Sequence, residues 1–333
     1  MLWTYPSRVA TLAFLLSACI SLGDAQSAYD FHQTLTVAPS EVVVLNVALA
    51  RGDLEIFYSR DGQVSLTASG HDSTGARLDA EALQSTLAIE QNGNRLTFRQ
   101  PAIVADLLER GVVRYRIDVP YRTQVTSTVE RGSQSFSGIL GPVAAKSIQG
   151  DIKASYVSRG FEAQVERGNI DLDVIGEKAN ATTNAGNISA TRLPQGIHAV
   201  SGDGDITLTE VGASAAQVTT RSGRIEVRGA QSSLEISTQT GDLHIKAEPH
   251  ADWRLCSVSG TIRIELPQSL KASLDASTES GVLQLDRNDL NQEGQYHDAL
   301  DQQHSEGRRL AQEISGGGPQ IHAHSDTGKI LIR

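Results

Sequence analysis

The sequence predicts an all-β protein, a two-sheet parallel β-solenoid with about 18 residues per coil and an N-terminal β cap. The first observation is a glycine that returns about every 18 residues, at Gly150, Gly168, Gly186, Gly204, Gly223, Gly241 and Gly260, and is extended by Gly281 and Gly328. A fixed period of this size is typical of a stack of identical small units. The second observation is the low aromatic content of 5% with 30 glycines, which favours short strands and tight turns.

Each repeat contains two predicted strands, which become clear when positions are counted from the glycine. Positions −7 and −5 are apolar, as in Leu234 and Ile236, and positions +2 and +4 are apolar again, as in Ile225 and Val227. Alternation over this length indicates a half-buried strand. The alternation breaks at the glycine, where a tight turn is expected, and the Ser or Thr at position −3 is expected to bond the backbone of that turn.

Residues 1–25 have the pattern of a secretory signal peptide. Arg8 supplies the positive charge, residues 9–22 form an apolar run too short for a comfortable membrane span, and small residues then place the cleavage before Gln26. The competing interpretation is a lipoprotein, because the tetrapeptide Leu-Ser-Ala-Cys that ends at Cys19 resembles a lipobox with Cys19 as the lipidated residue. Both interpretations predict export, to the periplasm, the outer membrane or the cell surface, with membrane attachment only if Cys19 is lipidated.

Residues 26–125 are predicted to form an N-terminal β-section that covers one end of the solenoid, where sheet edges would otherwise be bare. It contains an early coil at 41–57, a hairpin at 87–98 and an alternating strand at 112–119, with a short helix near 79–83 or 105–110. Residues 126–333 then form the solenoid repeats. Their first coil, at Gly132, is degraded because Gln134 takes a core position.

A polar segment at about 286–318 separates the last coil from the others. It is rich in Gln, Asp and Glu and lacks alternation, so we expect a mobile insertion, with partner binding as its functional interpretation. The coils of Gly281 and Gly328 are expected to stack on each other, with the last coil closing the rod.

Charge and cysteine content restrict the function classes. The net charge of −10 argues against nucleic acid or anionic lipid as a partner, since both require a basic surface. After cleavage before Gln26, Cys256 is the remaining cysteine, so stability has to come from repeat stacking and not from a disulfide. Cys256 is expected outward beside Arg254, with a reactive thiol as the alternative to ordinary partial burial.

The residue patterns predict no catalytic, cofactor or metal site. His322 and His324 are expected on one outer face, with His198 and His244 also outward, but no cysteine or carboxylate has the spacing of a further metal ligand. Serines and histidines lack a nucleophile-elbow pattern. A calcium site would need an unbroken column of carboxylates, so turn chemistry is the simpler interpretation of the residues at position +1, which are Asp151, Asn169, Asn187, Asp205, Arg224 and Asp242.

The repeats resemble a known family. The segment RYRIDVP at 114–120, Val125 and the serial Ser/Thr-x-x-Gly-Asp-Ile coils are similar to the putative-adhesin family labelled domain of unknown function 4097. The resemblance covers residues 40–333 and implies an exported bacterial β-solenoid. The family has no established catalytic residues to transfer, and the long insertion departs from its plain pattern.

The predicted function is therefore that of a non-enzymatic cell-envelope protein, an adhesin or interaction scaffold whose partner is an envelope protein or glycan. Two alternatives stay open. One is a glycan-active envelope enzyme, which an open groove with converging carboxylates would favour. The other is a regulatory partner of a membrane stress system.

The assignment of faces gives a direct test. Ile225→Asp should destabilise the protein by more than about 4 kcal/mol, because position +2 faces the core and a buried unpaired carboxylate is costly. Glu226→Ala, one residue further on, should change the free energy of unfolding by no more than about 0.5 kcal/mol, because position +3 faces solvent. Urea denaturation measures both. Equal midpoints for the two variants would show that the faces are assigned wrongly.

Overall fold

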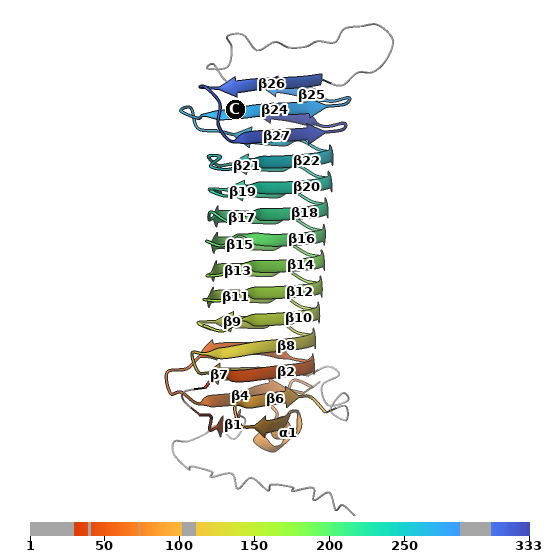
Figure 1. The fold of residues 1–333 in the computed structure, drawn as a ribbon. Coiled ribbons are helices and arrows are strands. Elements are labelled where there is room, and N and C mark those ends of the chain that lie inside the picture. Colours follow the sequence, from red (N-terminus) through yellow and green to blue (C-terminus); the bar gives the residue numbers. More distant parts are fainter. Residues whose placement is uncertain (1–29, 39–40, 73, 102–110, 287–307) are drawn as a thin grey trace, which may run out of the picture.

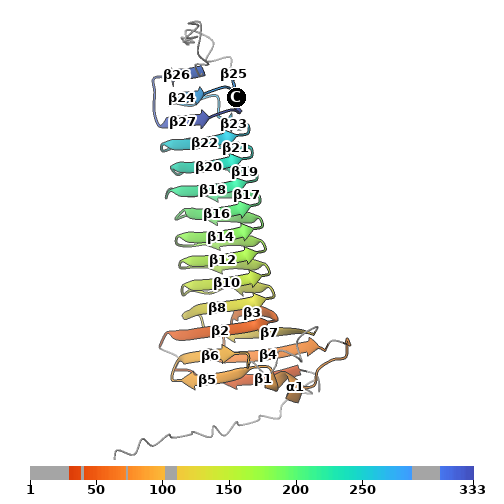
Figure 2. The ribbon, with the colours of Figure 1, turned by 90° about the vertical axis from the view of Figure 1, so that its right-hand side faces the viewer.

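The computed structural model describes residues 30–38, 41–72, 74–101, 111–286 and 308–333. The predicted two-sheet parallel β-solenoid is confirmed: the coils stack into a long rod, and two sheets of 14 strands each face one another across a thin core (Figure 1). Figure 2 shows the same rod turned by 90°, with the N-terminal section covering one end.

Each coil contributes one strand to each sheet. Sheet A consists, from the N-terminal end of the rod, of β1 (Asp30–Leu35), β4 (Val64–His71), β7 (Val112–Val119), β3 (Asp53–Tyr58), β9 (Gln134–Ser137), β11 (Ile152–Val157), β13 (Ile170–Ile175), β15 (Ile188–Leu193), β17 (Ile206–Val211), β19 (Ile225–Arg228), β21 (Leu243–Lys246), β23 (Ile262–Glu265), β28 (Lys329–Ile332) and β25 (Val282–Leu285). Sheet B consists, in the same direction, of β5 (Ala88–Asn92), β6 (Arg95–Arg99), β2 (Val43–Arg51), β8 (Thr123–Arg131), β10 (Val143–Gln149), β12 (Phe161–Arg167), β14 (Ala179–Ala185), β16 (Ile197–Asp203), β18 (Ala216–Ser222), β20 (Leu234–Thr240), β22 (Trp253–Ser259), β27 (Gln320–Ser325), β24 (Ala272–Thr278) and β26 (Arg308–Ile314).

Neighbouring strands in the middle of the rod are parallel and differ by one repeat. Ile170 of β13 pairs with Ile188 of β15, so residues at the same repeat position lie directly above one another. The inward positions form continuous buried rows, and Ile225 has no exposed surface while Glu226 faces outward. Gln134 is buried among them, as predicted. It accepts a hydrogen bond from Ser127 at 2.6 Å and donates one to the carbonyl of Lys146 at 2.7 Å, so its polar atoms are satisfied.

The repeated glycines form a column at the turn between the two strands of each coil. From Gly52 to Gly260 their φ angles lie between +125° and +155°, a region that residues with side chains rarely adopt, whereas Gly281 and Gly328 in the last two coils do not have such a φ. A Cβ atom on Gly186 would lie well inside contact distance of the carbonyl oxygen of Gly168 in the adjacent coil. Several hydroxyls at position −3 bond this column, as expected: Thr183 donates to the carbonyl of Gly168 at 3.0 Å, and Ser201 donates to that of Gly186 at 3.0 Å. The hydroxyls of Ser147 and Thr238, at the same position, are buried without a partner.

The N-terminal section first continues the solenoid and then covers its end. The early coil predicted at 41–57 consists of β2 and β3, which pair in parallel with β8 and β9. On its other side lie β6 and β7, which come later in the sequence. The antiparallel strands β1, β4 and β5 complete this end of the rod. The predicted hairpin at 87–98 is confirmed as β5 and β6.

The helix expected near 79–83 is α1 (Ala80–Ser85). Asp79 caps it, because the Asp79 side chain accepts a hydrogen bond from the backbone N–H of Ala82 at 2.8 Å. The alternative helix at 105–110 lies outside the described residues. Among the residues that the structure describes, no helix has the length and apolarity to cross a membrane.

The last coil is not at the end of the rod, and the sequence prediction is wrong on this point. Strand β27 lies between β22 and β24, and β28 lies between β23 and β25 (Figure 1). The glycine column follows the same order, since a Cβ on Gly328 would meet Gly260 and one on Gly281 would meet Gly328. The chain thus skips one position after β23 and fills it with its final residues. All coils share one pattern, so their sequence order does not fix their order in space.

Part of the polar segment at 286–318 is a packed strand and not a mobile arm. Strand β26 pairs antiparallel with β24, and Leu310 and Ile314 are 3% and 2% exposed. The sequence does not predict this strand, because the polar residue Gln312 stands between Leu310 and Ile314 and interrupts the alternation of apolar and polar residues. Residues 287–307 of the segment lie outside the described residues.

The glycine column predicts a large difference between two glycine substitutions. Gly186→Ala should destabilise the protein by at least about 3 kcal/mol, because an unfavourable φ adds to an overlap with backbone that cannot move aside. Gly62→Ala should cost only about 1 kcal/mol, because Gly62 also has a positive φ but nothing lies within 4 Å of an added Cβ. Urea denaturation of both variants tests this. Equal losses would mean that the column tolerates side chains.

Candidate functional site

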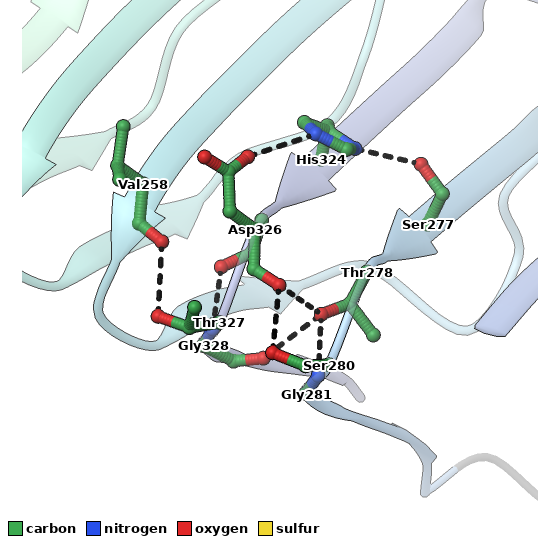
Figure 3. Close-up of polar contacts among 10 residues, drawn as sticks. Val258, Ser277, Thr278, Ser280, Gly281, His324, Asp326, Thr327 and Gly328 are labelled. Atoms are coloured by element: carbon green, nitrogen blue, oxygen red, sulfur yellow. Dashed lines mark hydrogen bonds and ion pairs between the residues drawn. The ribbon is translucent and has the colours of Figure 1, made fainter. Parts of the chain in front are cut away.

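A group of polar side chains lies on the outer face of sheet B, where the last coil is inserted (Figure 3). Strand pairing sets His324 of β27 between Cys256 of β22 and Ser277 of β24, all at position −4 of their repeats. Asp326 stands at position −2 of the Gly328 coil, and Glu279 stands at position −2 of the Gly281 coil. We call Ser277, Glu279, His324 and Asp326 the terminal polar cluster.

His324 is the centre of the terminal polar cluster. Its Nδ1 atom lies 2.9 Å from Oγ of Ser277, and its Nε2 atom lies 3.1 Å from Oδ1 of Asp326. The ligand-type atoms of Glu279, His324 and Asp326 all lie within 4.8 Å of one another. The side chains of His324 and Asp326 are 45% and 38% exposed, so the cluster is open to solvent.

Backbone hydrogen bonds between coils hold the carboxylate-bearing turns in place. The N–H of Glu279 donates to the carbonyl of Ser325 at 3.3 Å, and the N–H of Ser280 donates to the carbonyl of Asp326 at 2.9 Å. The N–H of Asp326 in turn donates to Ser257 in the coil below, at 3.2 Å. The cluster is therefore built on sheet and turn backbone that three coils share.

The expectation that no carboxylate accompanies the histidine pair does not hold. His322 and His324 lie outward as predicted, but Asp326 is two residues from His324 and Glu279 comes from the neighbouring coil. Sequence spacing along the chain could not show Glu279, which is 45 residues away. The signal was the repeat position, because Glu279 and Asp326 both stand at −2.

His322 belongs to a separate ionic group that docks β26. Its Nδ1 atom is 3.4 Å from Oδ2 of Asp275, and Arg309 of β26 binds both oxygens of Asp275 at 2.9 Å. The hydrogen bonds from Arg309, aided by the charges of Arg309 and His322, lower the pKa of Asp275. This bidentate contact between Arg309 and Asp275 holds β26, the last strand of sheet B, to β24.

Ser277, His324 and Asp326 form a line that resembles a nucleophile, base and orienting acid. The neighbouring backbone does not complete a hydrolase site, because Ser277 lies inside β24 and pairs with His324 on one side and Arg309 on the other. N–H groups in such a ladder bond adjacent strands and do not converge on a developing oxyanion. The line can relay a proton, but the described residues around it offer no oxyanion hole.

Cys256 is half-buried, and burial raises the pKa of its thiol, with Arg254 opposing the shift. A thiol with a raised pKa is mostly protonated at neutral pH and is a poor nucleophile, which supports the interpretation as ordinary partial burial. Cys19, the candidate for lipidation, lies outside the described residues.

The +1 column binds backbone in the structure. In six coil pairs the side-chain Oδ1 atom at +1 accepts a hydrogen bond of 2.7–3.0 Å from the backbone N–H of the +1 residue in the next coil. The acceptor and donor residues of these pairs are Asp53 and Ser133, Asp151 and Asn169, Asn169 and Asn187, Asn187 and Asp205, Asp205 and Arg224, and Asp242 and Thr261. These oxygens replace a missing backbone acceptor at the turn, which supports turn chemistry over calcium binding.

The outer face of sheet A carries a second histidine group. His244 lies between two glutamates, with Nδ1 3.6 Å from Glu226 and Nε2 3.0 Å from Glu265. The hydrogen bond from His244 lowers the pKa of Glu265. A shallow depression lies over Glu226, His244 and Arg263. The two glutamates contact opposite nitrogens of the ring, so they link three coils and do not converge on one point.

Three exposed tyrosines lie along one corner of the rod. Tyr58, Tyr121 and Tyr156 are 41%, 52% and 58% exposed, and the rings of Tyr58 and Tyr121 meet edge to face with centroids 5.4 Å apart. Tyr58 and Tyr156 both stand at position +6 and flank Gly138, which leaves the space between them without a side chain. We call these three residues the tyrosine edge.

The fold and these surfaces define a rod-like β-solenoid with polar, repetitive faces. The chain belongs to the family described as Toastrack DUF4097, whose model matches residues 43–333. This confirms the resemblance inferred from the repeats.

Solved structures similar to the chain include a putative adhesin from Bacteroides fragilis NCTC 9343, with 14% identity, a TM-score of 0.45 and coverage of 66% of this chain and 98% of that one. Another is a putative cell adhesion protein from Clostridium sporogenes ATCC 15579, with 11% identity, a TM-score of 0.23 and coverage of 91% and 98%. No curated protein matches the chain.

The docking of β26 predicts a local, pH-dependent effect of Asp275→Asn. Because the folded-state pKa of Asp275 is lowered, its contribution is present at neutral pH and is lost as the pH falls through that lowered pKa. Amide hydrogen exchange in residues 308–314 should be up to about fivefold faster in the variant at pH 7, which corresponds to about 1 kcal/mol. The difference should vanish in acid.

Asp171→Asn is the matched control, since Asp171 is an exposed carboxylate 3.9 Å from Lys153 in the middle of the rod. It should leave exchange in residues 308–314 unchanged. Identical exchange in wild type and Asp275→Asn at pH 7 would show that apolar packing alone holds β26.

Proposed function

We propose that this chain is a non-enzymatic binding protein of the bacterial cell envelope, which uses its rigid rod for adhesion or as a scaffold for another envelope component. The observation that carries the proposal is the regularity of the outer faces, where outward side chains recur at one-coil intervals along both sheets. A surface of this kind supports many similar contacts along an extended partner, and these contacts add through multivalency.

A glycan is the partner class that the tyrosine edge supports best. The faces of aromatic rings stack on the C–H faces of sugars, and exposed aromatic patches mark interaction sites. The strands that carry Tyr58 and Tyr156 are two strand spacings apart, about 9.6 Å, so an extended ligand can lie across both coils. The net charge of −10 favours a neutral or cationic glycan over an acidic one.

Export is part of the proposal and rests on the leader at residues 1–25. The pattern supports a mature chain that begins near Gln26 outside the cytoplasm. Mass spectrometry of the native N-terminus decides between this soluble form and a lipoprotein, which would begin at an acylated Cys19.

The binding test uses the mature protein and insoluble envelope polysaccharide in a co-sedimentation assay. The combined variant Tyr58→Ser, Tyr121→Ser and Tyr156→Ser should bind at least about tenfold more weakly, because exposed aromatic anchors carry much of the energy of such contacts. Val258→Ser is the matched control, since Val258 is 48% exposed in the upper part of the rod, and it should bind like wild type.

Two outcomes would contradict the proposal. Equal binding by wild type and the combined tyrosine variant would rule out the tyrosine edge as a glycan site. Covalent labelling of Ser277 by a fluorophosphonate probe, lost in Ser277→Ala, would show a reactive serine and favour the hydrolase alternative. That alternative rests on the line formed by Ser277, His324 and Asp326.

A further inference from the structure

We propose that Glu279, His324 and Asp326 form a binding site for a divalent transition-metal ion such as Zn²⁺, which ties the inserted last coil to the Gly281 coil. This inference is independent of the proposed adhesive function. It rests on the geometry of the terminal polar cluster, of which Figure 3 labels Ser277, His324 and Asp326, and on its place between two coils that are 47 residues apart in the chain.

The orientation of His324 suits a metal ligand. Its Nδ1–H can donate to Ser277 at 2.9 Å, which leaves the Nε2 lone pair directed toward the carboxylate of Asp326. Histidines that bind metals almost always use the second ring nitrogen in this way, and the outer hydrogen bond fixes the tautomer and the ring. Ser277 is therefore a positioning residue for the site.

The separations between the ligand atoms also suit an ion of this size. Zinc binds histidine nitrogen and carboxylate oxygen at about 2.0–2.2 Å, so neighbouring ligands in a tetrahedral site lie about 3.3 Å apart. Nε2 of His324 and Oδ1 of Asp326 are 3.1 Å apart, and a carboxylate oxygen of Glu279 lies within 4.8 Å of a ligand-type atom of each of these two residues.

Electrostatics favours a cation at this point. Register places Glu279 and Asp326 at the same repeat position in adjacent coils, and like charges in neighbouring strands repel each other. Among the described residues no lysine or arginine forms an ion pair with either carboxylate, and His324 is the one basic group paired with Asp326. A divalent ion would neutralise both carboxylates where no side chain of the described chain does.

The ligand set selects the class of ion. One imidazole nitrogen with two carboxylate oxygens suits Zn²⁺ and other first-row transition ions, whereas Ca²⁺ and Mg²⁺ prefer oxygen alone. Three protein ligands on an open surface leave at least one position for water or for a group from a partner. Because the ligands come from two coils, binding would stabilise the insertion of β27 and β28 beside β24 and β25.

The test uses the full mature chain after chelator treatment, titrated with ZnCl₂ while amide hydrogen exchange is followed. Zinc should slow exchange in residues 278–281 and 322–328 and should raise the melting temperature. His324→Ala and Glu279→Gln should each weaken this local protection at least tenfold, in line with the loss of a metal ligand. Glu279→Gln keeps the shape of an exposed side chain, so it tests the site even if His324→Ala disturbs the fold.

His322→Ala is the matched control, because it removes a histidine from the same strand and the same face, outside the proposed ligand set. It should keep the zinc-dependent protection. Protection that is absent in wild type, or that is equally strong in Glu279→Gln, would overturn the proposal, as would equal weakening by His322→Ala.

Discussion

The close approach of backbone to backbone along the glycine column is the constraint on which the rest of the structure depends. At this corner each coil lies so near the next that a Cβ atom would overlap a carbonyl group. A shift of one residue in any coil would bring a side chain into that space and would also turn its apolar residues outward. The column therefore fixes the register of every coil, and the register decides which side chains meet.

The other repeated features follow from this fixed register. In coils such as that of Gly204, the hydroxyl at −3 reaches the glycine carbonyl one coil away, and the Asx oxygen at +1 of one coil reaches the N–H of the next turn, because residues at the same repeat position lie above one another. The same rule creates the functional surfaces. Tyr58 and Tyr156 share position +6, and Glu279 and Asp326 share position −2, so each pair is brought together by stacking and not by nearness in the chain.

The sequence was sufficient for the features that depend on one coil and its copies. The inward rows and the buried Gln134 follow from local alternation, and the period of about 18 residues follows from the spacing of the glycines. The short helix expected near 79–83 is α1, and the structure adds its cap at Asp79. The order of coils in space could not be predicted in the same way. The coils at Gly260, Gly281 and Gly328 have equivalent patterns, so any of them satisfies the glycine column beside any other. The terminal polar cluster was missed although the Gly281 and Gly328 coils were expected to stack, because metal ligands were sought by spacing along the chain and position −2 of the two coils was not compared. Strand β26 was missed because Gln312 interrupts its apolar face.

The inserted last coil has a consequence for how the molecule is completed. A chain that emerges from its N-terminus delivers β27 and β28 after β24 and β25, so until these two strands emerge the Gly260 and Gly281 coils lack the strands that pair with both of them, and their sheet edges are open. Strands β27 and β28 thus fill an internal position of the rod and join its last two strand pairs to the coils before them. A product that stops short of residue 320 would retain both edges, and each would be a template for a strand from another molecule.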